Sequence, residues 1–96
     1  MADEDPNQWR IDNARHARLQ GVELHFRPYR RRSETWDHDH CAACRDKFAE
    51  AALLPDALHE GYTTGSDFPR GEEYEWVCAT CFTELAGTLG WTVAGR

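Results

Sequence analysis

Apolar positions change their period along the chain, and each change predicts a different element. After Asp5 and Pro6, which suit the start of a helix, apolar side chains recur over residues 9–19. Gly21 then suits the left-handed turn that ends many helices. We therefore predict a helix over about residues 6–20, with a broad apolar face rather than a narrow stripe.

After this helix, apolar and polar residues alternate along the chain. Val22, Leu24 and Phe26 alternate with polar residues, which predicts a half-buried strand ended by Pro28. Residues 35–41 are expected to form a short return strand that leads into the first cysteine pair.

A second helix is predicted directly after that cysteine pair. Cys44, Phe48 and Ala51 fall on one helical face, and Pro55 follows the apolar run. We expect this helix to cover residues 45–54.

The C-terminal third predicts a hairpin followed by an amphipathic helix. Residues 61–64 and 74–78 are strand-like and are joined by a long connection rich in glycine, proline and charge. Apolar spacing from Ala79 predicts a helix that ends at Gly90. The apolar residues 91–93 are expected to fold back onto the core.

The composition indicates that these elements belong to one folded domain. The chain has 96 residues, of which 41% are hydrophobic and 29% charged, as in folded rather than disordered proteins. Its longest apolar run, residues 51–54, is too short to cross a membrane, and residues 1–5 lack the basic and apolar segments of a secretion signal. We therefore expect a cytoplasmic protein.

Charge is distributed unevenly along the chain. Residues 10–32 contain seven arginines and an excess of five positive charges, whereas residues 37–96 carry an excess of seven negative charges. The net charge of −6 argues against a typical nucleic-acid-binding module, whose binding is driven by positive charge. A local interaction patch is still predicted, formed by Arg27, Tyr29, Arg30, Arg31 and Arg32.

Two CxxC motifs are the strongest chemical signal. Cys41/Cys44 and Cys78/Cys81 are the four cysteines of the chain, and a turn with two intervening residues directs both sulfurs to one point. Two such turns supply a tetrahedral shell for one structural Zn²⁺, with no coordination position left for water. The alternatives are two disulfides, which a reducing cytosol disfavours, or four thiols with no shared role.

The order of motifs and elements resembles a treble-clef zinc finger. A cysteine knuckle, a hairpin and a helix that contributes the last two ligands follow one another over about residues 38–90. The resemblance implies a small α+β domain stapled by zinc, with an N-terminal helix and short antiparallel strands. We divide the single domain, residues 1–96, into an N-terminal helix-and-strand extension, residues 1–37, and a zinc-binding module, residues 38–96.

Two histidines precede the first knuckle. His38 and His40 lie on one face of an extended segment, and we expect them to hydrogen-bond near the thiolates and to fix the knuckle. The string Asp37-His-Asp-His40 also resembles the catalytic segment of HNH and endonuclease VII-type nucleases, in which histidines and an acid hold a divalent metal and activate water. In those enzymes the string lies between the cysteine pairs, whereas here it precedes both. A second metal site at His38 and His40 is a further alternative.

Aromatic residues are numerous enough to build the core of a small domain. Two of them, Tyr29 and Phe68, are predicted to be exposed as interface anchors. The others are expected mostly in the core: Trp9, Trp36, Phe48, Tyr62, Trp76, Phe82 and Trp91.

A resemblance also extends over most of the chain. The segments at residues 36–44, 59–64, 76–82 and 90–91 resemble a group of small bacterial zinc-binding proteins without an assigned activity. The resemblance implies a bacterial cytosolic protein and no particular reaction.

Two functions of different kinds are therefore predicted. The first is a non-enzymatic protein-interaction module, such as an adaptor, an inhibitor or an immunity-type protein, whose acidic surface binds a protein partner. The alternative is a nucleic-acid-binding regulator that uses the basic cluster at residues 27–32. We expect no small-molecule substrate, because no nucleophile, base and oxyanion site occur together.

Overall fold

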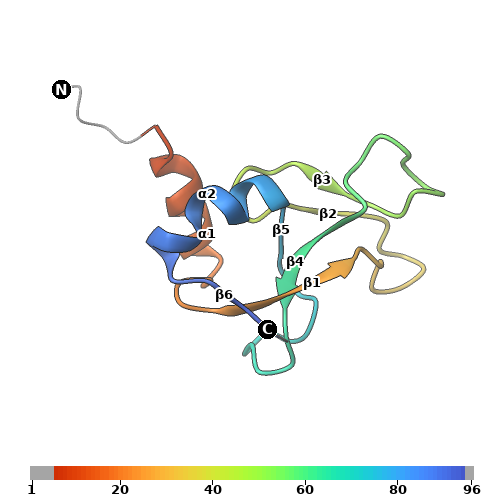
Figure 1. Ribbon diagram of the computed structural model, residues 1–96. Helices are drawn as coiled ribbons and strands as arrows, with labels where there is room; N and C mark the ends of the chain where they lie inside the picture. The colour runs from red at the N-terminus through yellow and green to blue at the C-terminus, as the bar shows by residue number, and fades with distance from the viewer. Residues whose placement is uncertain (1–5, 95–96) are drawn as a thin grey trace.

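A four-stranded sheet and a separate two-stranded hairpin form the centre of the protein, and two helices pack side by side at one end (Figure 1). The computed structural model describes residues 6–94. In chain order the elements are α1 (Gln8–His16), β1 (Glu23–Pro28), β2 (Asp39–His40), β3 (Lys47–Phe48), β4 (Glu60–Thr64), β5 (Trp76–Val77), α2 (Ala79–Leu89) and β6 (Thr92–Val93). Neither helix has the length and apolar composition needed to cross a membrane.

The sheet has the strand order β5-β4-β1-β6 and mixed pairing. β1 pairs antiparallel with β4, with Phe26 opposite Tyr62, and parallel with the short β6. The predicted alternation along β1 is confirmed at Leu24, which is fully buried, but Phe26 is 47% exposed. Because β1 occupies an inner position, the N-terminal segment is an integral part of the sheet.

The first helix is shorter than predicted. It begins after Asn7, whose side chain makes no cap hydrogen bond, and ends at His16 rather than near Gln20. Arg18 has a φ of 68°, and this left-handed residue turns the chain so that Leu19 enters the core. The predicted cap at Asp5 lies outside the described residues.

The predicted helix over residues 45–54 is wrong. Arg45 has a φ of 74°, and Cys41 N–H donates to the Asp46 carbonyl at 2.7 Å, so the chain reverses into the β2–β3 hairpin. Phe48 is fully buried from a strand, where it packs 5.6 Å from the Trp76 ring. The apolar run that follows has no buried helical face, since Ala51, Ala52 and Leu53 are all exposed. The expected return strand over residues 35–41 is reduced to β2.

The last helix and the C-terminal tail confirm their predictions, whereas the strand predicted over residues 74–78 is reduced to β5. Cys78 caps α2 by accepting a hydrogen bond from Cys81 N–H, and Gly90 ends the helix with a φ of 71°. Beyond this turn, Trp91 is buried and its indole N–H donates to the Leu19 carbonyl at 2.6 Å. The tail therefore folds back onto the core beside α1 and β1.

Four aromatic residues lie on the opposite side of the core–surface boundary from the one predicted. Trp9 and Trp36 are 53% and 43% exposed, although both were expected in the core. Tyr29 and Phe68 are buried, although both were expected at the surface. Tyr29 is buried because its ring stacks on Phe48 and lies 4.9 Å from Trp76, so the aromatic core extends to the end of β1.

Candidate metal centre

Four cysteine sulfurs converge where the β2–β3 hairpin meets the start of α2. The Sγ atoms of Cys41, Cys44, Cys78 and Cys81 all lie within 4.8 Å of one another. The hairpin is held against β5 by a hydrogen bond of 2.8 Å from Ala42 N–H to the Trp76 carbonyl, which brings the first pair to the second. The structure thus assembles the cluster that the two CxxC motifs predicted.

Backbone N–H groups point at the sulfurs. Cys41 Sγ accepts from the N–H groups of Cys44 and Cys78 at 3.5 and 3.3 Å, and Cys78 Sγ accepts from Cys81 N–H at 3.4 Å. These bonds orient the sulfurs and favour the thiolate form, as in structural metal sites.

The dimensions of the cluster fit one metal ion. Cys44 Sγ and Cys78 Sγ are 3.7 Å apart, and all four thiols are free rather than joined as disulfides. A tetrahedral ion with metal–sulfur bonds of about 2.3 Å would place its sulfurs about 3.8 Å apart. The four cysteines could therefore bind one metal ion, and three of them are buried.

Three of the thiols influence one another's ionisation. Hydrogen bonds from the Cys78 and Cys81 side chains lower the pKa of Cys41, whereas burial raises the pKa of Cys44 to about 12. The hydrogen bond of Cys81 to Cys41 raises the pKa of Cys81. A negative charge on Cys41 thus opposes ionisation of Cys44 and Cys81, and a divalent cation would remove that opposition.

Arg10 adds a positive charge to the cluster from a distant part of the chain. It lies on α1, is only 9% exposed, and its guanidinium donates to Cys81 Sγ at 3.4 Å and to the Glu84 carboxylate at 2.7 Å. The hydrogen bond with Glu84 raises the pKa of Arg10. The sequence does not predict this contact, because Arg10 and Cys81 are 71 positions apart. The one local indication that Arg10 is buried is that it precedes Ile11, which is buried too.

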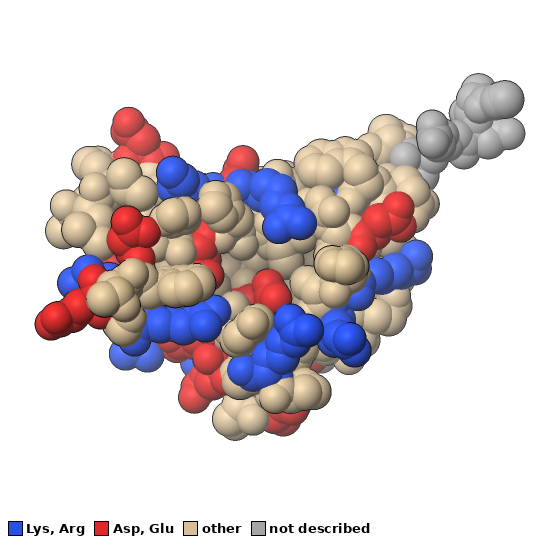
Figure 2. Space-filling view, turned by 180° about the vertical axis from the view of Figure 1, so that it is seen from behind, with Lys and Arg blue, Asp and Glu red and all other residues tan. Residues whose placement is uncertain are grey.

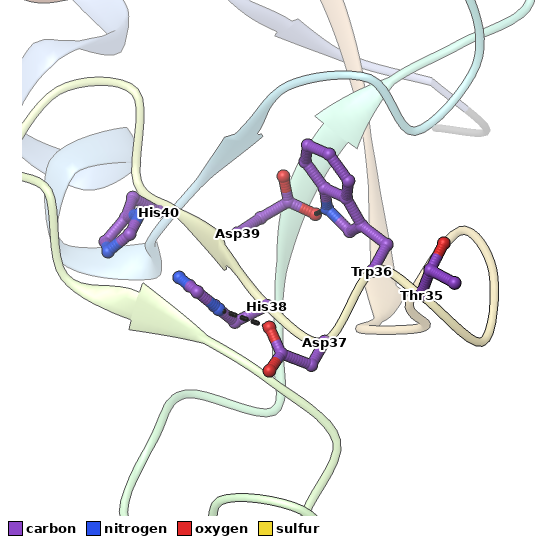
Figure 3. A pocket seen from close by; sticks show the side chains of 6 residues that line it. All are labelled: Thr35, Trp36, Asp37, His38, Asp39 and His40. Carbon is purple, nitrogen blue, oxygen red and sulfur yellow. Dashed lines mark hydrogen bonds and ion pairs between the residues drawn. The ribbon is translucent and has the colours of Figure 1, made fainter.

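The two histidines lie beside the cluster but do not contact it. Backbone N–H groups and Arg10 donate to the sulfurs, and neither imidazole is among the hydrogen-bond donors to sulfur within residues 6–94. His38 Nδ1 instead lies 2.6 Å from an Asp37 carboxylate oxygen, and the His38 and His40 rings face a surface hollow lined by residues 35–40 (Figure 3). The expected support of the thiolates by these side chains is not what the geometry shows.

The predicted arginine patch is divided among acidic partners. Arg27 donates to Glu72 and Glu73 at 2.7 and 2.9 Å, and Arg30 lies 3.2 Å from the same Glu73 carboxylate. Arg31 Nε lies 3.8 Å from a carboxylate oxygen of Glu50. Figure 2 shows acidic side chains among the basic ones rather than one continuous positive surface.

Two members of that patch have other contacts. Tyr29 is buried and its hydroxyl donates to Asp39 at 2.6 Å; burial raises the pKa of this hydroxyl. The Arg32 guanidinium lies 4.8 Å from the centre of the Trp36 ring and 4.5 Å from that of Tyr74. The five residues therefore do not form one exposed cluster.

Comparisons with protein-family models, with curated proteins and with solved structures find no match. The resemblances to small bacterial zinc-binding proteins and to nucleases therefore stay predictions. The four-cysteine cluster is the feature on which a functional argument rests.

Proposed function

We propose that the ion bound by the four cysteines is zinc and that its role is structural. Four thiolates in tetrahedral geometry are typical of Zn²⁺, and a shell closed by four protein ligands has no position for a reacting water. The order of elements supports a treble-clef-like arrangement, in which the β2–β3 knuckle and the β4–β5 hairpin precede a helix that carries the last two ligands.

The protein so stapled serves as a protein-interaction module, and one surface feature carries this proposal. Trp36 is 43% exposed, and the Arg32 guanidinium contacts both its ring and that of Tyr74. Trp, Tyr and Arg are the residues that dominate binding hot spots. Because the stacking orders these long side chains in advance, they lose less conformational entropy when a partner binds.

The acidic net charge suits a basic partner surface. The chain carries a charge of −6, and electrostatic complementarity increases the rate of association. The nucleic-acid alternative has less support, because Arg27, Arg30 and Arg31 each lie close to a carboxylate that would oppose phosphate binding.

Affinity capture with two matched tryptophan variants tests this function. Tagged protein is captured gently from its own host, cross-linked and identified by mass spectrometry. We expect a defined protein partner whose recovery falls at least tenfold with Trp36→Ser and does not change with Trp9→Ser, which alters a tryptophan of similar exposure on α1.

Equal recovery with wild type and both variants, or no partner, would contradict the role of this surface. Captured nucleic acid that is lost at high salt, and lost with replacement of residues 30–32, would instead favour the nucleic-acid alternative.

A further inference from the structure

We propose a second metal site in this protein, formed by His38 and His40 and separate from the cysteine cluster. It would take a divalent first-row transition ion that prefers imidazole ligands, with water at the remaining positions. The proposal concerns residues that the interaction function does not use, and it does not depend on which ion the cysteines hold.

The alternation of β2 and the residue before it directs the two imidazoles to the same side. Figure 3 shows His38 and His40 on one side of the strand and Asp39 on the other, beside Trp36. Asp39 is occupied there, since it accepts from the Trp36 indole at 3.1 Å and from the Tyr29 hydroxyl. The fixed Asp39 and the pairing of β2 with β3 hold the backbone that carries both histidines.

Asp37 prepares His38 for metal binding. Its carboxylate lies 2.6 Å from His38 Nδ1 and can only accept, so Nδ1 donates to it and Nε2 is the nitrogen left to bind an ion. Figure 3 shows this Nε2 edge directed toward the His40 ring. A carboxylate that accepts from the far nitrogen is the usual partner of a metal-bound histidine, because it fixes the tautomer and the ring orientation.

The distance between the rings fits a shared ion. The two ring centres are 4.9 Å apart, with an angle of 87° between the ring planes. Metal–nitrogen bonds of about 2.0–2.1 Å and a tetrahedral angle would place the ring centres about 5 Å apart. The spacing of the ring centres therefore suits one ion bound by both imidazoles.

The surroundings leave room for water ligands. The rings border an open hollow of about 380 Å³, lined by Thr35 and Trp36 as well as by the string 37–40. His40 is exposed, so an ion could enter from solvent. With two protein ligands and an open face, this site would exchange its ion, unlike the buried cluster of four thiols.

Zinc itself is a suitable probe, used on full-length protein already loaded with one equivalent. Calorimetry with added Zn²⁺ counts a second equivalent, and NMR identifies the imidazoles whose signals shift. We expect a second binding event that shifts the signals of both histidines, and that weakens at least tenfold with either His38→Ala or His40→Ala.

Two further variants distinguish the site from general surface binding. His16→Ala removes an exposed histidine on α1 and is expected to leave the second event unchanged. Asp37→Asn is expected to weaken it by a smaller factor, because the amide holds the His38 ring less firmly. Retention of the first zinc equivalent in each variant shows that the fold and the cysteine cluster are intact.

Absence of a second equivalent would overturn the proposal. So would a second event that is unchanged in both His38→Ala and His40→Ala. Neither result bears on the cysteine cluster, because that site is tested separately by the first equivalent of bound zinc.

Discussion

Two groups of candidate metal ligands lie at the β2–β3 hairpin and its contact with α2, and they differ in burial and in ligand number. The cysteine cluster gathers four sulfurs from two distant segments, and three of these cysteines are buried. The histidine pair consists of two neighbouring side chains at an open hollow. An ion in the first group joins parts of the fold, whereas an ion in the second contacts only one segment. We therefore expect the first to determine stability and the second to have little influence on it.

Loss of a cysteine ligand is the largest expected effect. Cys78→Ser is predicted to lower the free energy of unfolding by about 5 kcal/mol or more, because metal binding and folding are coupled in small metal-stapled domains. Near-ultraviolet circular dichroism and zinc content measure the loss, and Ala79→Ser at the adjacent exposed position is the control. A Cys78→Ser protein with a native spectrum and no zinc would show that the staple is unnecessary.

Arg10 is expected to have an intermediate effect, because it joins α1 to the cluster. Arg10→Met keeps much of the side-chain volume but removes the hydrogen bonds to Cys81 and Glu84, at an expected cost of about 1–3 kcal/mol. Faster transfer of zinc to a chromogenic chelator should accompany this cost, since the thiolates lose a compensating charge. Arg15→Met, on the exposed side of the same helix, is the matched control. Equal stability and equal transfer rates in the two variants would argue against this coupling.

The histidine pair is expected to have the smallest effect on folding. His40→Ala should change the free energy of unfolding by less than about 0.5 kcal/mol in protein with its cysteine site loaded, because the side chain is exposed. Urea denaturation measures this difference. A loss as large as that of a cysteine variant would mean that His40 supports the knuckle after all.

Local patterns predicted the elements whose determinants are themselves local. α2 has a clear apolar face, a cap at Cys78 and a left-handed glycine at its end, and it was predicted almost to the residue. The strand at β1 was equally clear from its alternation. The CxxC spacing likewise identified all four members of the cluster, because each pair is positioned by its own turn.

Other features depend on contacts between distant residues. The apolar run at residues 45–54 has a spacing compatible with a helix, and only the hairpin bonds around Arg45 and the packing of Phe48 select a strand. The arginines next to Tyr29 in the sequence predict a surface position for it. In the structure its hydroxyl donates to Asp39 and its ring packs in the aromatic core. Arg10 was missed for the same reason, since its acceptor lies on the last helix.

Native mass spectrometry of the purified protein tests the central claim most directly. The account predicts a folded protein whose mass per chain exceeds that of the bare chain by one zinc ion less the protons it displaces. Cys78→Ser should lose this mass together with the folded charge-state distribution. A folded protein without metal, or one lighter by the four hydrogens lost in two disulfides, would contradict the account.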